Sequence, residues 1–185
     1  MDNKEKELSE MDIRHTGIWF EKVSFDQFVK DMCDKNGYPD NEEVRVALQE
    51  LYDRIKLPRR GTSGSAGYDF YMPYNLSLSP GRTYTIPTGI RCHMPYGIVL
   101  MCYPRSGLGF KYGMRLRNST GIIDSDYAFA DNEGHIMACM TVDEECNLDI
   151  TDRFMQGVFL PYFIVDGDEP IKQERHGGIG STGGC

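Results

Sequence analysis

The chain has 185 residues, 40% of them hydrophobic and 26% charged, and it carries a formal net charge of −8. This length and composition suit one globular domain with a sizeable core. The acidic balance argues against broad binding to nucleic acid or to a membrane surface, because both need basic patches.

Residues 1–16 form a charged segment without the apolar region of a secretory signal. The longest apolar stretch, GVFLPYFIV at 157–165, is far shorter than the roughly 20 residues of a membrane span. The six cysteines and four histidines are scattered, so the sequence predicts neither a disulfide framework nor a zinc site. We therefore expect a cytoplasmic protein with reduced thiols.

Residues 17–23, GIWFEKV, are typical of a strand. The sequence SFDQ that follows fits a capping box, in which the side chains of Ser24 and Gln27 would each bond to the other residue's backbone amide. Apolar residues then recur at helical spacing, and NGYP at 36–39 ends the helix.

A second capping box is predicted at Asp40 and Glu43. Apolar residues then follow on one face of a helix. That face comprises Val44, Leu48, Leu51, Tyr52 and Ile55. The sequence therefore predicts a helical insertion over residues 24–55, with an acidic outer surface, inside a single domain spanning residues 1–185.

Residues 57–185 differ in composition from the preceding segment, since 18 of the 20 glycines come after residue 58. Short apolar runs alternate there with turn signals such as SPGR, PYG and DEECN. Regular strand spacing of this kind predicts an all-β barrel or sandwich.

The sequence YPRSGLGFKYG places Arg105, Ser106 and Gly107 directly after an apolar run. A guanidinium, a hydroxyl and an open backbone amide are suited to a phosphate chain. On its own the motif is more typical of a simple turn.

The C-terminal sequence RHGGIGSTGG, residues 175–184, combines Arg175 with glycines and the hydroxyls of Ser181 and Thr182. Glycine lets backbone amides approach an anion closely. The alternative is a chain end without a binding role, and we expect residues 175–185 to form a mobile tail.

The sequence GIIDSDY, residues 121–127, places Asp124 and Asp126 two residues apart, so in a strand both side chains would leave the same face. A turn is the alternative interpretation. Asp69, in SAGYDF, fits either a turn or a site. For Arg153, in TDRFMQ, a structural salt bridge is at least as plausible as phosphate binding.

Five stretches, SAGYDF, PRSGLGFKYG, NSTGIIDSDY, TDRFMQ and RHGGIGSTGG, occur in this order within residues 57–185. Together they resemble the five motifs of trimeric dUTP pyrophosphatases (dUTPases). The resemblance implies a jelly-roll-like β-barrel subunit and a homotrimer with shared active sites. It also implies Mg²⁺-dependent hydrolysis of dUTP to dUMP and pyrophosphate, by attack of water on the α-phosphate.

The same resemblance implies residue roles. Asp124 would activate the water, Tyr127 would stack under the deoxyribose, and Asp69 would touch the hydration shell of Mg²⁺. The uracil slot would be lined by Asn118 and by the backbone of Ile122, Ile123 and Asp124, with Gly121 and Met137 as further substrate contacts. The phosphates would be held by Arg105, Ser106, Gly107 and Gln156. The C-terminal residues closing over the substrate would be Arg175, which is also catalytic, Ile179, Gly180, Ser181 and Thr182.

The sequence departs from this family pattern in four places. Ile179 stands where the family has a phenylalanine that stacks on uracil, and the stretch from Arg175 to that position is one residue shorter than usual. A longer hairpin, AFADNE, follows the motif tyrosine and brings Asp131 and Glu133 near the ligand if they face it. The predicted helices at 24–55 are the fourth departure.

Two rival interpretations stay open. A dCTP deaminase shares the fold but needs an extra glutamate acting on the base, and HIMACMTV at 135–142 has no acid. A nucleotide-gated regulatory protein would use residues 24–55 as a surface for a protein partner. Neither interpretation predicts a nucleic-acid or membrane partner.

Overall fold

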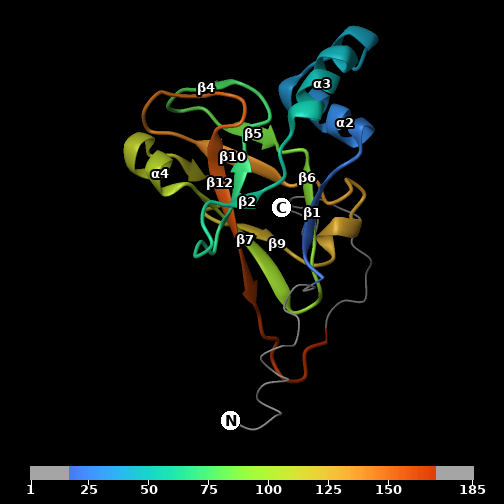
Figure 1. Cartoon of the computed structure of the whole chain (residues 1–185), viewed down its shortest axis with the longest axis vertical. Helices are drawn as coiled ribbons and strands as arrows, with labels where there is room; N and C mark the ends of the chain where they lie inside the picture. The colour runs from blue at the N-terminus through green and yellow to red at the C-terminus, as the bar shows by residue number, and fades with distance from the viewer. Residues whose placement is uncertain (1–16, 170–185) are drawn as a thin grey trace.

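The computed structural model describes residues 17–169 (Figure 1). The predictions for Arg175, Ile179, Gly180, Ser181 and Thr182 therefore lie outside the described residues. No helix within the described range is long and apolar enough to cross a membrane.

The predicted strand and helical hairpin are confirmed as β1 (Trp19–Lys22), α2 (Phe25–Asn36) and α3 (Glu42–Arg54). Gly37 ends α2 in the left-handed conformation, with φ of 72°, and its amide donates to the carbonyl of Cys33. Glycine adopts this conformation at little cost, which explains why the NGYP sequence ends the helix.

The two helix starts differ in detail from the predicted capping boxes. The hydroxyl of Ser24 accepts from the amide of Gln27 at 3.1 Å, as predicted, but the Gln27 side chain donates to Asp31 instead. The cap of α3 is Asn41 and not Asp40, since the Asn41 side chain accepts from the amide of Val44 at 3.0 Å.

Asp40 lies one residue too early to cap α3, and it pairs with Arg45 at 2.7 Å. The predicted acidic outer surface is also only partly right, because Asp31 on α2 is 6% exposed. The apolar faces of the two helices pack as predicted, and Phe28, Met32 and Leu48 belong to the same hydrophobic core as the strands.

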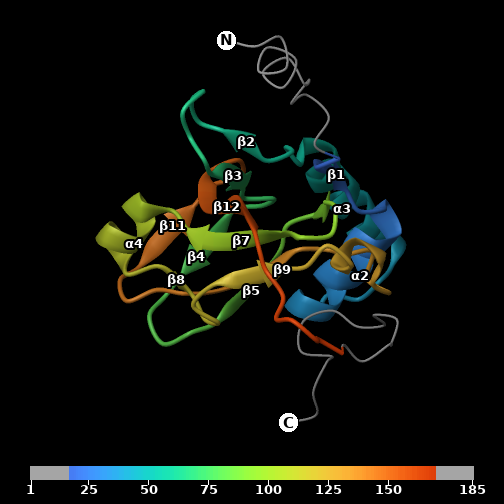
Figure 2. The ribbon, with the colours of Figure 1, turned by 90° about the horizontal axis from the view of Figure 1, so that it is seen from below.

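The remaining described elements are mostly short strands. They are β2 (Arg59–Arg60), β3 (Tyr68–Tyr71), β4 (Leu76–Leu78), β5 (Tyr84–Pro87), β6 (Ile90–His93), β7 (Ile98–Pro104), α4 (Ser106–Tyr112), β8 (Arg115–Leu116), β9 (Gly121–Ile123), the 3-10 turn η1 (Tyr127–Phe129), β10 (Met137–Thr141), β11 (Cys146–Leu148) and β12 (Arg153–Pro161). The helical hairpin and α4 lie on opposite sides of these strands (Figures 1 and 2).

The described strands pair in four separate antiparallel sheets, and they form no closed barrel. The largest sheet has the order β2-β3-β12-β7-β9. The mostly β fold is thus as predicted, whereas barrel closure is not found between residues 17 and 169. The reason is that the strands are short and their hydrogen-bonded ladders stop before the sheets join.

The register of the largest sheet brings three sequence motifs together. Gln156 on β12 lies opposite Asp69 on β3 and opposite Tyr103 on β7. Opposed residues in antiparallel strands have neighbouring side chains. Motif residues far apart in the chain therefore meet at the end of β7, where α4 begins.

Candidate active site

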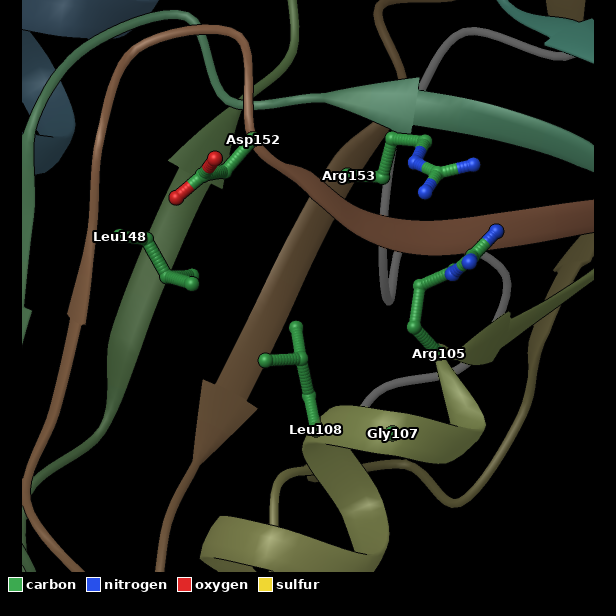
Figure 3. Close-up of a pocket in the computed structure, with 6 residues that line it drawn as sticks. All are labelled: Arg105, Gly107, Leu108, Leu148, Asp152 and Arg153. Carbon is green, nitrogen blue, oxygen red and sulfur yellow. The ribbon is translucent and has the colours of Figure 1, made fainter. Parts of the chain in front are cut away.

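A first group of predicted residues surrounds a cavity of about 320 Å³ beside α4, which we call the arginine pocket (Figure 3). It is lined by Arg105, Gly107, Leu108, Leu148, Asp152 and Arg153. Two guanidinium groups form one wall of the pocket, and the carboxylate of Asp152 lies on another side (Figure 3). Such a wall suits a phosphate chain, because arginine binds phosphate with its planar fork of N–H donors.

One buried carboxylate holds both arginines. Asp69 is 3% exposed; its Oδ1 accepts from Nη1 of Arg105, and its Oδ2 lies 3.2 Å from Nη1 of Arg153. The predicted structural salt bridge of Arg153 is thus confirmed, and the same side chain lines the pocket. The role predicted for Asp69 beside Mg²⁺ stays a prediction, since both of its oxygens are used by arginines here.

Two further predicted phosphate contacts lie close by but do not line the cavity. Ser106 is the first residue of α4 and is exposed. Gln156 donates from Nε2 to the carbonyl of Pro104 at 3.4 Å. A Cβ atom on Gly67 would lie 2.7 Å from Oε1 of Gln156, so a larger residue there would displace the end of the Gln156 side chain.

A second pocket, which we call the base slot, has a volume of about 260 Å³. The predicted residues in its lining are Asn118, Gly121, Ile123 and Met137, with Cys102 and Met155 at its floor. A largely apolar slot that also carries the amide of Asn118 and the guanidinium of Arg117 suits a flat base with polar edges. Burial raises the pKa of the Cys102 thiol to about 12, so this thiol stays uncharged at neutral pH.

A third pocket, the acidic pocket, has a volume of about 480 Å³. Its lining includes Tyr96, Ile122, Asp124 and Asp126. Side chains of a strand alternate between faces, so Gly121 and Ile123 of β9 reach the base slot while the side chains of Ile122 and Asp124 reach this pocket. The predicted backbone contacts of these two residues to uracil stay a prediction.

The two aspartates of GIIDSDY satisfy both interpretations of the motif. The strand ends at Ile123 and a turn follows, in which the amide of Tyr127 donates to the carbonyl of Asp124 at 3.1 Å. Asp124 and Asp126 are nonetheless exposed and line the same pocket, although they lie in the turn and not in a continued strand.

Tyr127 lies deeper than the sequence suggests, with 3% of its surface exposed. Its hydroxyl donates to the carbonyl of His135 at 2.9 Å and accepts from Nδ2 of Asn132 at 3.0 Å. Stacking under a sugar stays a prediction for this ring. Neither Asn132 nor His135 was predicted as a site residue, because neither belongs to one of the five motifs.

Glu133 turns away from the acidic pocket. Its carboxylate accepts from the amide of Ser24 at 2.7 Å and from the hydroxyl of Ser24 at 2.5 Å, so it caps the start of α2. Glu133 thus accepts the hydrogen bond from the Ser24 amide that the predicted capping box assigned to the side chain of Gln27.

No cluster of three or more His, Cys, Asp or Glu side chains within residues 17–169 could hold a metal ion. Mg²⁺ keeps several waters and usually binds through one or two carboxylates together with substrate phosphates. The arrangement therefore fits an ion carried into the site by a triphosphate rather than one held in a cage of protein ligands.

Comparisons with known proteins point to one family. The family model described as dUTPase matches residues 53–183. The deoxyuridine 5′-triphosphate nucleotidohydrolase of Lactococcus lactis is 46% identical over 133 residues, which are 70% of this chain and 89% of that protein. The Hahella chejuensis protein of the same name is 38% identical over 150 residues, 76% of this chain and 95% of that one.

Solved structures give the same result. The crystal structure of the Streptococcus mutans dUTPase matches with a TM-score of 0.58 and 33% identity, covering 80% of this chain and 98% of that one. A dUTPase from phage phi11 of S. aureus, with a TM-score of 0.54 and 18% identity, shares the fold over 66% of this chain and 93% of that one.

Proposed function

The chain belongs to the dUTPase family and is a dUTP diphosphatase, and we propose that it cleaves dUTP by attack of a water at Asp124 on the α-phosphate. The observation that carries this mechanism is the sorting of the predicted residues into three pockets. One pocket presents two guanidinium groups, one is a largely apolar slot and one holds exposed carboxylates. These suit the triphosphate, the uracil and the attacking water.

The arginine pocket supplies charge to the triphosphate. Arg105 and Arg153 are 30% and 50% exposed at their side chains, so each guanidinium has donors free for phosphate oxygens beyond those facing Asp69. The carboxylate fixes their orientation before substrate arrives, and fixed charges stabilise a transition state better than mobile ones. The family is generally Mg²⁺-dependent, and a bound ion would neutralise further phosphate charge.

Asp124 is the proposed general base. A carboxylate at the edge of a solvent-filled pocket can orient a water and accept its proton, an effect worth about 10²–10⁴ in rate. Asp126, in the same pocket, is proposed to have a structural role. Release of pyrophosphate then leaves dUMP.

We further propose a homotrimer with shared active sites. Its support is that the arginine pocket and the acidic pocket have no lining residue in common, so one copy offers two half-sites. Exposed apolar side chains flank the acidic pocket, including Tyr96 at 74%, Ile122 at 59% and Leu160 at 41%. Surfaces of this kind are covered in oligomers.

The reaction is tested by incubating the chain with Mg²⁺ and, separately, with dUTP, dCTP, dTTP and UTP. Formation of dUMP and pyrophosphate from dUTP alone supports the proposal, whereas release of ammonia from dCTP would establish deamination instead.

The shared site is tested by mixing two inactive variants, Asp124→Asn and Arg105→Ala, after dissociation and reassembly. Recovery of part of the wild-type activity would show that the two groups act from different copies. Light scattering on the same samples gives the number of subunits.

A further inference from the structure

The helical insertion reaches the active-site loop through a buried histidine. His135 is 0% exposed, and both ring nitrogens have partners. Its Nδ1 lies 2.6 Å from Oδ2 of Asp31 on α2, and its Nε2 accepts from the amide of Gly89 at 2.7 Å. The side chain of Asp31, in the helical insertion, thus holds His135 at the end of the loop that follows Asp124.

The hydrogen bonds define the tautomer of this imidazole. A backbone amide can only donate, so Nε2 of His135 carries the lone pair and Nδ1 carries the proton. The contact to Asp31 is therefore a charge-assisted hydrogen bond from a neutral ring to a carboxylate. Asp31 accepts a second hydrogen bond from Nε2 of Gln27 at 2.7 Å.

The loop of residues 124–136 is fixed at further points. Glu133 bonds to Ser24 at the start of α2. Gly134 has φ of 70°, and a Cβ atom there would lie 2.6 Å from the carbonyl oxygen of Tyr127. The loop is therefore packed tightly against its own first turn as well as against the insertion.

The same histidine reaches Tyr127 directly. The backbone carbonyl of His135 accepts the hydroxyl proton of Tyr127 at 2.9 Å, so the two residues are linked across the loop. A shift of the His135 backbone would move the partner of the Tyr127 hydroxyl. Asp31, His135 and Tyr127 thus form one continuous chain of contacts from α2 to the motif GIIDSDY.

We infer that Asp31 is a positioning residue for the active site, which acts through His135 to hold the loop that carries Asp124 and Tyr127. This inference rests on the proposed function of those two residues. The helical insertion then has a role inside its own subunit. It supports the loop that carries Tyr127, the residue proposed to stack under the deoxyribose. The role needs no protein partner.

The test is the variant Asp31→Asn, which keeps the size of the side chain and removes its charge. We measure kcat/KM for dUTP and for UTP and compare their ratio, because a smaller folded fraction lowers both values equally. A misplacement of about 1 Å can cost about 10²-fold in rate, and we expect the dUTP-to-UTP ratio to fall by about tenfold or more. The matched control is Asp34→Asn, which removes the same charge from an exposed position of α2.

A second variant tests the same inference if Asp31→Asn does not fold. Gln27→Leu removes only the second hydrogen bond to the carboxylate, and we expect a smaller fall of the ratio in the same direction. A wild-type ratio in either folded variant would overturn the inference and leave Asp31 with a stabilising role alone.

Hydrogen exchange of the amides of residues 127–136 gives a readout that does not depend on hydrolysis. We expect faster exchange there in Asp31→Asn, and no change in Asp34→Asn. If the wild type released no dUMP, the proposed function would fail while this measurement still decided whether Asp31 fixes the loop; unchanged exchange would overturn the inference.

Discussion

Arg105 donates a hydrogen bond to Asp69, a carboxylate that is buried in the largest sheet while the arginine reaches into the pocket beside α4. The acid is 36 residues earlier in the chain and in a different motif. The pairing links the first motif to the second, and under the proposed function Asp69 would fix the direction in which the guanidinium of Arg105 meets the triphosphate.

We expect Asp69→Asn to lower kcat/KM for dUTP by about 10²-fold, because the two arginines lose the charge that orients them. Steady-state kinetics on purified protein checks this. The control is Asp143→Asn, which breaks a pair to Arg115 in which both side chains are more than half exposed. Exposed pairs contribute little, so its activity should match the wild type; a similar loss in both variants would contradict the orienting role.

Removal of Mg²⁺ with EDTA should abolish dUMP release, since the triphosphate charge is then left without its counter-ion. In Asp69→Asn we expect the half-saturating Mg²⁺ concentration to match the wild type, because both oxygens of Asp69 are used by arginines. A titration of activity against Mg²⁺ decides this point. A clearly raised requirement would instead support the role beside the metal that the sequence predicts.

Asp124→Asn should lower kcat by about 10²–10⁴-fold, while a non-hydrolysable imido analogue of dUTP still binds. Loss of the base removes the proton acceptor and leaves the arginine pocket and base slot intact. Asp126→Asn is the matched control, because Asp126 lines the same pocket two residues later. Equal losses of kcat in the two variants would be evidence against Asp124 as the base.

Met137→Ala should let the enzyme accept dTTP, because a shorter side chain widens the base slot for a 5-methyl group. One extra methylene in an apolar pocket changes kcat/KM by about 10–200-fold. We therefore expect the dUTP-to-dTTP ratio of kcat/KM to fall by a factor within that range. Met101→Ala is the control, since Met101 lines the acidic pocket on the other face of β9. Unchanged selectivity in Met137→Ala would place the base elsewhere.

The stabilising effect of Asp31 should depend on pH. Burial by itself raises the pKa of the Asp31 carboxyl, but hydrogen bonds from His135 and Gln27 outweigh it and hold this pKa below its usual value of 3.8. The ionised form is therefore the one that stabilises the fold, and its contribution is present above pH 3.8 and lost as the pH falls through the lowered pKa.

The difference in melting temperature between wild type and Asp31→Asn should accordingly be largest above about pH 5 and shrink towards pH 3. Calorimetric scans across this range check it. A difference that grew on acidification would mean that the protonated carboxyl is the stabilising form.

Local patterns predicted the helical hairpin well. Ser24 caps α2 and Gly37 ends it, because these signals act within a few residues of one helix. The second cap was misplaced by one residue, since Asp40 and Asn41 are both good caps and only the contact of Asp40 with Arg45 separates them.

Long-range partners could not be predicted from the sequence. Asp31 and His135 are 104 residues apart, and nothing in either local pattern indicates the other. The sequence predicts that Glu133 lies near the ligand if its side chain faces the ligand. The sequence does not show that α2 begins beside Glu133. The motif order indicated which residues share a function, whereas their division among three pockets depends on the pairing of strands in three dimensions.

The contacts of Glu133 with Ser24 and of His135 with Asp31 make the helices and the lengthened loop a single module. A chimaera that exchanged residues 24–55 alone would remove the partner of the buried Nδ1 of His135 and the two hydrogen bonds that Glu133 accepts from Ser24. Exchange of the loop alone would remove the partner of the Ser24 amide and one of the two hydrogen bonds that the Asp31 carboxylate accepts. The two segments must therefore be transplanted together, or deleted together, for the recipient to keep a properly formed active site.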